Sequence, residues 1–386
     1  MNIATSVSTP TFWLPSDVAA IADNPLPEIP VLRGRPAFPQ FAGLDLWDMW
    51  PVQLRGGETA DFDGWILWMI LSAPSLPDPV DRHGVARIRL VMQRGDEWRD
   101  CGNLFPDGFC PGKREWAGSA MYDPRAGQVT VFWTAAGRRS DDHISFEQRM
   151  FQSSGRVHFG DDHISITGWS APVESFTSDD DYYVVANQQA GAPGQIKGFR
   201  DPAYFQDPAD GRSYLLFTGS LKKAEHSHNA VIGIARSSGG LDEEWMLLPP
   251  IISAVGLNNE LERPHALYHN DSYYVFWSTQ TFVFSSRGPN GPNGLYGMVA
   301  PSILGPYRPL NGTGLVAANP AAEPYQCYSW LVMADLTVAS FVDYWGMKGG
   351  RLDQHPQRVR SHFGGVPAPL FRITLDGDRT EMLGEL

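Results

Sequence analysis

The stretch AMYDPRAGQVTVFW, residues 120–133, joins two short apolar runs through a turn that contains Asp, Pro and Gly. The second run is rich in Val, Phe and Trp, which is typical of a β-hairpin. Residues 203–217 and 266–277 repeat this pattern, each with Asp, Asn or Gly where a tight turn requires them. Helical periodicity is scarce along the chain. The sequence therefore predicts an all-β fold built from hairpins.

A polar cluster stands at the start of each of these hairpins, and two similar clusters occur elsewhere in the chain. The five clusters lie 61 to 85 residues apart when they are aligned on Asp48, Trp116, Asp201, Glu262 and Tyr328. Repeats of this size in an all-β chain favour a β-propeller, in which four-stranded blades surround a central channel. The inner strands of the blades all begin at the same end of the channel. We therefore predict a five-bladed β-propeller whose polar clusters converge on one deep axial pocket.

The chain of 386 residues is expected to form a single domain of five units. Residues 1–40 are predicted to be an N-terminal extension that packs on the propeller, and residues 366–386 a C-terminal closing segment. The segment 285–297 is rich in Gly, Pro and Asn, and it is expected to be a long surface loop.

The net charge of −13, from 43 acidic and 30 basic residues, excludes partners that need a basic face. Nucleic acids and anionic membrane surfaces are therefore not expected partners. The longest apolar run, residues 65–73, is too short to span a membrane. Residues 1–15 lack a basic segment followed by an apolar one, so no conventional signal peptide is recognised. Secreted or periplasmic residence by a signal-independent route and cytoplasmic residence both stay open.

The three cysteines do not form a zinc pattern or a full disulfide framework. They are expected to be free thiols, although the spacing of Cys101 and Cys110 is compatible with a local disulfide. The acidic segments 141–145, 161–165 and 179–181 lack the spacing of an EF-hand loop, and they are interpreted as hairpin loops and a solvated edge. No metal and no cofactor is predicted.

Three carboxylates stand among aromatic, Arg or Pro residues and not on charged faces: Asp48, Asp201 and Glu262. Buried ionisable groups are costly, so their place at blade starts calls for pairing or for a function. Each signal alone has a plain structural alternative, a turn for Asp201-Pro202 or a surface ion pair for Glu262-Arg263. Two carboxylates and a third acid in one pocket are the equipment of a glycosidase. In a retaining glycosidase one carboxylate attacks the anomeric carbon and a second acid protonates the leaving oxygen.

The motifs resemble those of a known family when they are read in order. Five motifs carry the resemblance: Trp47-Asp48-Met49-Trp50-Pro51, Arg114-Glu115-Trp116-Ala117-Gly118-Ser119, Phe199-Arg200-Asp201-Pro202, Glu260-Leu261-Glu262-Arg263-Pro264 and Tyr328-Ser329. The series is similar to that of the levansucrase family, which includes inulosucrases and bacterial β-fructofuranosidases. The likeness extends from about residue 40 to residues 363–365 and Pro369, so it covers most of the chain.

This resemblance implies a role for each motif residue. Asp48 would be the nucleophile that forms a fructosyl-enzyme, and Glu262 would be the general acid and then the base. Asp201 would stabilise the transition state by holding fructose hydroxyls. The remaining residues would bind substrate: Arg200, Glu260 and Arg263 by shaping the sugar subsites, Trp47 and Trp116 by lining the pocket, and Tyr328 by hydrogen-bonding near the nucleophile.

Three positions depart from the family pattern. Gln280 stands where polymer-forming members from Gram-negative bacteria carry His, and Gln cannot become cationic, so it would hold an acceptor sugar differently. Trp330 stands where many relatives have His. Asn259 replaces the Asp that calcium-binding members place before the acid/base motif, so no calcium is predicted.

The resemblance implies a retaining enzyme that cleaves sucrose, releases glucose and passes fructose to water or to small sugar acceptors. The first alternative is a polymer-forming levansucrase or inulosucrase, because water and acceptor sugars compete for one intermediate. The second alternative, from another class, is a propeller that only binds glycans. That protein would not need three acids at blade starts.

Overall fold

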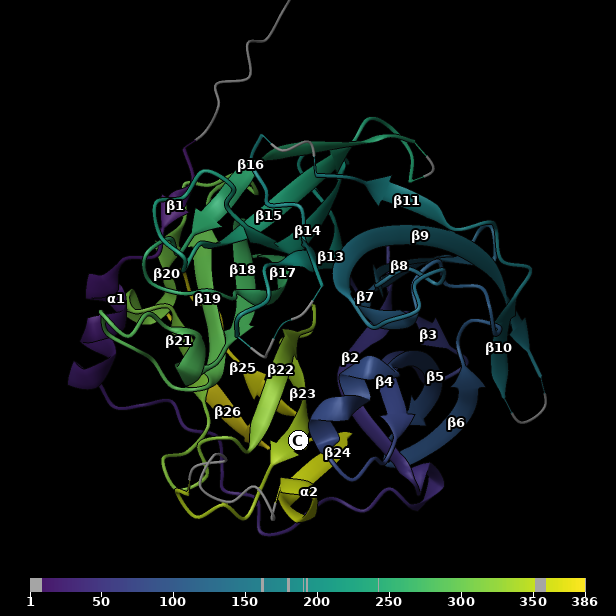
Figure 1. Ribbon diagram of the computed structural model, residues 1–386, viewed down its shortest axis with the longest axis horizontal. Coiled ribbons are helices and arrows are strands. Elements are labelled where there is room, and N and C mark those ends of the chain that lie inside the picture. Colours follow the sequence, from purple (N-terminus) through teal and green to yellow (C-terminus); the bar gives the residue numbers. More distant parts are fainter. Residues whose placement is uncertain are drawn as a thin grey trace, which may run out of the picture.

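The computed structural model describes residues 9–160, 163–178, 181–189, 191, 194–241, 243–350 and 359–385. They form an all-β molecule in which short helices occur only in the connections. The strands form five antiparallel groups in chain order, and Figure 1 shows these groups one after another around the centre of the molecule. The prediction of an all-β fold is confirmed.

The first two groups are joined in one eleven-stranded sheet. The first contains β2 (Leu44–Leu54), β3 (Asp61–Phe62), β4 (Trp65–Pro74), β5 (Arg87–Arg94) and β6 (Glu97–Asn103). The second contains β7 (Arg114–Asp123), β8 (Gln128–Ala136), β9 (Phe146–Phe159), β10 (Ile164–Thr167), β11 (Val173–Phe176) and β12 (Asn187–Gln188). A short parallel pairing of β2 with β7 connects them.

The other three groups are separate sheets of five strands each. The third contains β13 (Phe199–Gln206), β14 (Ser213–Ser220), β15 (Ala230–Ser237), β16 (Trp245–Ser253) and the N-terminal β1 (Thr11–Phe12). The fourth contains β17 (Glu262–His269), β18 (Ser272–Thr279), β19 (Gly294–Ala300), β20 (Arg308–Pro309) and β21 (Leu315–Ala318). The fifth contains β22 (Cys327–Val332), β23 (Thr337–Tyr344), β24 (Phe363–Pro367), β25 (Phe371–Ile373) and β26 (Met382–Glu385).

The described helices are all short. They are α1 (Pro15–Ala19), α2 (Val359–His362) and the 3-10 helices η1 (Ala20–Asp23), η2 (Pro39–Phe41), η3 (Pro79–Gly84), η4 (Thr281–Val283) and η5 (Leu310–Gly312). In the part of the chain that the structure describes, no helix has the length and apolar character of a membrane span.

The three hairpins predicted from the sequence are present as β7–β8, β13–β14 and β17–β18. Their turns use the expected residues: Asn270 and Asp271 both adopt positive φ, as a two-residue hairpin turn with the twist of the strands requires. The predicted loop 285–297 is wrong at its end. Gly294 already begins β19, because the small glycines let buried neighbouring strands approach closely.

The N-terminal segment packs against the third and fourth groups. β1 pairs in parallel with β16, and the indole of Trp13 donates a hydrogen bond to the carbonyl of Thr313 at 3.0 Å. The backbone N–H of Ile29 donates to the carbonyl of Ala318 at 2.9 Å. The division of the chain into one domain with two end segments stays a prediction. All three cysteines are free thiols, so the alternative of a Cys101–Cys110 disulfide is wrong for this structure.

The first strand of every group is interrupted by a β-bulge within its polar cluster. The register shifts at Asp48, Ala117, Asp201, Arg263 and Ser329. Four of these residues have positive φ, between 33° and 63°, which is unusual for residues other than glycine. The equivalent positions therefore differ by one residue from the markers Trp116, Glu262 and Tyr328. A bulge redirects a side chain out of the alternation of the strand, and such distortions concentrate at functional sites.

Candidate active site

A pocket of about 630 Å³ opens where the five first strands meet. Figure 1 shows β2, β7, β13, β17 and β22 around the centre of the fold. The pocket is lined by all ten residues that the sequence analysis singled out: Trp47, Asp48, Trp116, Arg200, Asp201, Glu260, Glu262, Arg263, Gln280 and Tyr328. Its volume is in the range of small-molecule sites. The expected convergence of the polar clusters is therefore observed.

Asp48 lies at the bulge of β2, with a φ of 33°. Burial raises the pKa of its carboxyl group, and the negative charge of Glu262 adds to this effect. The positive charge of Arg263 and a hydrogen bond with Ser329 act in the opposite direction. Burial thus outweighs the stabilisation that Arg263 and Ser329 give to the charged form of Asp48.

Asp201 lies at the bulge of β13 and is held by two hydroxyl groups. Its backbone N–H donates to Thr134 Oγ1 at 2.8 Å, and Thr218 Oγ1 donates to its carboxyl oxygen Oδ2 at 2.9 Å. Burial raises the pKa of Asp201 to about 6, although Arg200 opposes this shift. The negative charges of Glu262 and Asp48 contribute in the same direction as burial. The carboxyl group is therefore fixed in one orientation.

Glu262 is held at both carboxyl oxygens. Arg200 Nη2 donates to Oε1 at 2.6 Å, and the Tyr328 hydroxyl donates to Oε2. Gln280 in turn interacts with Tyr328 by a side-chain hydrogen bond. These contacts orient Glu262 toward the centre of the pocket from two neighbouring strands.

Arg200 is the cation at the centre of this acidic group. Its guanidinium lies 3.5 Å from the carboxyl of Asp201 and 3.4 Å from that of Glu260, in addition to its bond with Glu262. Burial and the charge of Glu262 raise the pKa of Glu260, because the stabilisation by Arg200 does not outweigh them. One cation therefore balances a cluster of buried carboxyl groups, which the planar guanidinium can do through several donors.

Arg263 joins three of the first strands. Its backbone N–H donates to Thr218 Oγ1 at 3.0 Å, and its guanidinium donates to Ser329 Oγ at 2.6 Å and to the carbonyl of Met49 at 2.8 Å. The side chain is 7% exposed, so these bonds are well shielded from water. Arg263 thus connects β17 with β22 and with the strand that carries Asp48.

Hydroxyl groups on the second strands fasten several bulges of the next group. Thr134 on β8 binds the N–H of Asp201, Thr218 on β14 binds the N–H of Arg263, and Ser278 on β18 accepts from Trp330 N at 2.9 Å. We call Thr134, Thr218 and Ser278 the hydroxyl straps. They satisfy buried donors that the irregular strand backbone would otherwise leave unpaired.

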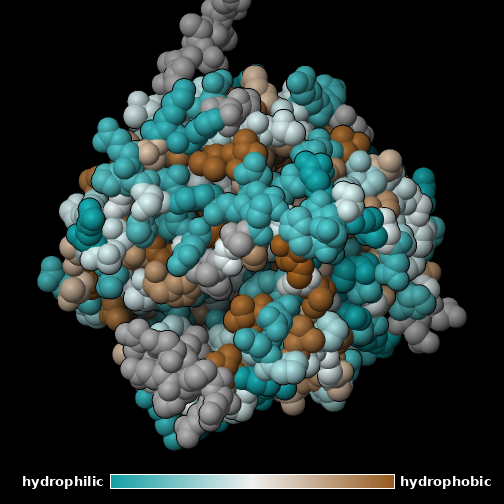
Figure 2. All heavy atoms as spheres, in the orientation of Figure 1, coloured by the Kyte–Doolittle hydropathy of each residue, from teal (hydrophilic) through white to brown (hydrophobic). Residues whose placement is uncertain are grey.

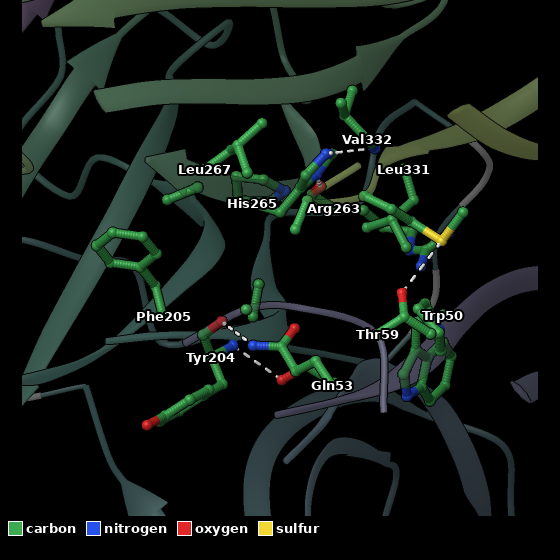
Figure 3. A pocket seen from close by; sticks show the side chains of 18 of the residues that line it. Trp50, Gln53, Thr59, Tyr204, Phe205, Arg263, His265, Leu267, Leu331 and Val332 are labelled. Atoms are coloured by element: carbon green, nitrogen blue, oxygen red, sulfur yellow. Dashed lines mark hydrogen bonds between the residues drawn. The ribbon is translucent and has the colours of Figure 1, made fainter. Parts of the chain in front are cut away.

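A second cavity, of about 70 Å³, shares Asp201 and Arg263 with this pocket, and Figure 3 shows Arg263, His265 and Val332 in its lining. His265 Nε2 accepts from the N–H of Val332 at 2.9 Å, and its Nδ1 donates to the carbonyl of Arg263 at 3.0 Å. Burial lowers the pKa of His265 to about 4. The imidazole is therefore neutral and serves to hold the backbone of Arg263 and β22.

Sequence reasoning missed three charged residues of the pocket, Asp343 on β23 and both Asp81 and Arg82 in η3. Asp343 is 8% exposed, and its Oδ1 has no hydrogen-bond partner among the described residues. Burial and the negative charge of Asp48 raise the pKa of Asp343 to about 7 against the effect of Arg82. Arg82 lies over the ring of Trp47, 5.3 Å from its centroid. One sequence feature points to Asp343: it is the single acidic residue in the otherwise apolar or uncharged strand β23.

An ammonium group lies beside Asn259. Lys197 Nζ donates to Asn259 Oδ1 at 2.6 Å, to Asn229 Oδ1 at 2.7 Å and to the carbonyl of Ser227. Within the described ranges, no three metal-ligating side chains form a group. Residues 161, 162, 179 and 180, part of the acidic segments considered above, lie outside the described residues. The donor set at Asn259 thus already binds a cation of the chain itself.

The comparisons with known proteins agree with this site. The chain matches the family described as Levansucrase/Invertase over residues 4–229 and 221–384. It belongs to this levansucrase family. It is 30% identical over 413 residues to levansucrase LscA of Pseudomonas savastanoi pv. glycinea, an alignment that covers 96% of this chain and 94% of the relative. The resemblance recognised in the motifs is thereby confirmed.

Solved structures of the family have the same fold. The inulosucrase from Halalkalicoccus jeotgali bound to kestose has a TM-score of 0.90 and is 37% identical, over 98% of this chain and 96% of that one. The levansucrase from Gluconacetobacter diazotrophicus has a TM-score of 0.81 and is 26% identical, over 97% and 90% of the two chains. These neighbours agree with the family expectation of a propeller-type fold.

Proposed function

We propose that the chain is a sucrose-cleaving fructosyltransferase that acts with retention of configuration and passes fructose to water or to small sugar acceptors. The observation that carries the proposal is the convergence of Asp48, Asp201 and Glu262 in one pocket, with Arg200 among the acids. A retaining mechanism needs a nucleophilic carboxylate and a separate acid, both facing the same glycosidic bond.

Asp48 is proposed as the nucleophile that attacks C2 of the fructosyl unit. Its carboxyl group lines the pocket at the bulge, and Arg263 and Ser329 stabilise the ionised form that the attack requires. The bond from C2 to the bridging oxygen then breaks, and a covalent fructosyl ester of Asp48 forms. Trp47 and Trp116 supply apolar walls for the sugar faces.

Glu262 is proposed as the acid that protonates the departing glucose oxygen and then as the base that activates water or an acceptor hydroxyl. Tyr328 and Arg200 fix its orientation. Glu260, whose pKa is raised by burial and by the charge of Glu262, keeps a proton beside the catalytic acid near neutral pH. Asp201 is proposed to bind fructose hydroxyls as the ring gains positive charge, because Thr218 donates to its carboxyl group and Thr134 holds its backbone N–H.

The architecture is proposed to be a five-bladed propeller with an axial pocket. Five antiparallel strand groups support this proposal, since each opens with a bulged strand that contributes to one pocket. Each group would correspond to one blade. A measured crystal structure with a sucrose analogue would test the position of the pocket relative to the axis.

The second candidate is a polymer-forming levansucrase or inulosucrase. The names of the relatives favour it, since the curated matches are levansucrases and the 37% identical structure is an inulosucrase. Gln280 favours the first candidate, because it cannot offer the cationic group that His would supply to an acceptor sugar. A Microbacterium saccharophilum β-fructofuranosidase is among the structures with the same fold.

The test incubates the purified protein with concentrated sucrose and measures glucose release and product size. Small fructosides and free fructose are expected, with little fructan of high mass. Abundant polymer would replace the first candidate by the second. Glucose release that persists undiminished in Asp48→Ala and Glu262→Ala would refute the assigned roles, and no glucose release from the native protein would favour glycan binding alone.

A further inference from the structure

The mouth of the active-site pocket is apolar, in contrast to its charged floor. Four large hydrophobic side chains that line it are exposed: Val80 (41%), Val85 (46%), Ile144 (52%) and Phe282 (53%). Leu76 and Ile196 line the same pocket and are partly exposed. We call these six residues the apolar collar. Figure 2 shows hydrophobic atoms exposed near the centre of the molecular face.

The collar is built from four separate connections, before β5, between β8 and β9, before β13 and after β18. Two glycines show how closely these connections approach one another. A methyl group on Gly84 would lie 3.5 Å from Ile144 Cδ1, and one on Gly194 would lie 2.7 Å from the ring of Phe282. The collar therefore consists of two pairs of neighbouring connections, each of which exposes large apolar side chains at the pocket.

This surface is poorly suited to a chain of sugars. Among the described residues that line the pocket and are largely exposed, only Asp81 has a charged or polar side chain. The hydroxyl groups of a fructan leaving through the mouth would find few hydrogen-bond partners there. Exposed apolar surface of this kind marks a binding site for an apolar group.

The collar is also continuous with the place where a fructosyl-enzyme would form. Trp47, Trp116 and Glu262 lie in the same pocket, so an acceptor hydroxyl can reach the reacting carbon while its attached group lies against the collar. A molecule that fits both parts has a hydroxyl group or a sugar at one end and a hydrocarbon at the other.

We propose that the apolar collar binds the aglycone of an amphiphilic acceptor, so that fructose is transferred to alkyl or aryl glycosides. The proposal rests on the proposed function. In this step the acceptor oxygen bonds to C2 of the fructosyl ester, the bond from C2 to Asp48 breaks, and the acceptor proton passes to Glu262. Each methylene that the collar buries increases acceptor binding by about fourfold, up to the length of the collar.

The experiment follows transfer to methyl, butyl and hexyl β-D-glucopyranoside at one fixed concentration with saturating sucrose. Glucose release reports total cleavage, and chromatography separates the fructosylated glycoside from free fructose. The ratio of transfer to hydrolysis is expected to rise at least tenfold from the methyl to the hexyl acceptor. A flat ratio in the native protein would overturn the proposal while leaving the cleavage of sucrose intact.

The variants Ile144→Ser and Phe282→Ser separate the collar from general hydrophobic effects. In both variants, the increase in the ratio of transfer to hydrolysis from the methyl to the hexyl acceptor is expected to be about threefold or more smaller than in the native protein. The matched control is Phe159→Ser, since Phe159 is 55% exposed and lies outside the pocket; it is expected to keep the native slope. An equally steep rise in all three variants would refute a role of the collar. Absence of glucose release from the native protein would refute the proposed function and with it this proposal.

Discussion

Asp48 and Asp201 occupy equivalent bulges of two first strands, yet their surroundings differ. Asp201 is held by Thr134 from the preceding group and by Thr218 from its own. At the corresponding positions around Asp48 the chain carries Phe341, which pairs with Tyr328, and Leu71, which pairs with Trp47. Both apolar side chains line the pocket.

The same backbone feature, a β-bulge, thus presents two carboxyl groups to the pocket in different surroundings. A hydroxyl strap fixes the carboxyl of Asp201 as a rigid acceptor and satisfies part of its lone pairs. The apolar neighbours of Asp48 offer no such donor, so its carboxyl group is stabilised instead by the charge of Arg263 and a hydrogen bond with Ser329. The surroundings of each acid are therefore set by the second strands and not by the bulge itself.

The largest effect on activity is expected when the carboxyl group of Asp48 or of Asp201 is removed. Asp48→Ala removes the attacking group and is expected to lower kcat by about 10⁵-fold or more. Asp201→Ala removes only transition-state stabilisation and is expected to lower kcat by about 10³-fold. Steady-state glucose release measures both, and Asp335→Ala on the exposed β22–β23 turn is the control.

The intermediate distinguishes the two acids further. Mass spectrometry after acid quenching is expected to find a fructosyl adduct in Asp201→Ala and none in Asp48→Ala. An adduct that persists in Asp48→Ala would assign the nucleophile to another residue.

Thr218→Val makes the surroundings of Asp201 resemble those of Asp48. The change leaves the N–H of Arg263 without its acceptor and Asp201 without its donor, so the free energy of unfolding is expected to fall by about 1–3 kcal/mol. The kcat is expected to fall by about tenfold or more, since Asp201 is no longer fixed.

Thr130→Val is the matched control for this strap. Thr130 is buried on β8, and its hydroxyl bonds Ser154 and does not line the pocket. Denaturant unfolding should detect a loss of stability in both variants, while sucrose kinetics should change in Thr218→Val alone. A normal kcat in Thr218→Val would show that Asp201 does not depend on its strap.

Asp343 gives a pH-dependent effect on stability beside Asp48. Burial raises the pKa of Asp343 to about 7, so its ionisation destabilises the fold as the pH rises through that value, and the penalty is absent below about pH 4. Asp343→Asn is expected to gain stability over the native protein between pH 4 and pH 8, by up to about 4 kcal/mol. Denaturant unfolding of both proteins at pH 4 and pH 8 measures this gain. A stability difference between them that does not change with pH would contradict the raised pKa of Asp343.

The smallest effect is expected at Gln280, which lines the pocket and hydrogen-bonds Tyr328. Gln280→His is expected to change the ratio of transfer to hydrolysis by less than about tenfold, because a subsite contact contributes about 1 kcal/mol. Glucose release should stay within about twofold of the native value. Product sizing measures the outcome, and a complete loss of cleavage would place Gln280 in the catalytic step instead.

Much of the site was predictable because its residues stand in local motifs. Asp48, Asp201 and Glu262 were found from their aromatic, Arg and Pro neighbours, and the hairpins from turn residues such as Asn270. Asp343 was missed because β23 carries no turn signal or motif near it. Its place beside Asp48 depends on strands almost 300 residues apart in the chain, which no local pattern encodes.

The chain by itself determined its strands, its turns and the order of its polar clusters, because backbone preferences and alternation act over a few residues. Only the tertiary structure decided which residue of each cluster forms the bulge, which hydroxyl straps hold it, and that the apolar collar lines the pocket. Those features arise between neighbouring strand groups, where a hydrogen bond or a contact depends on residues that are distant in sequence.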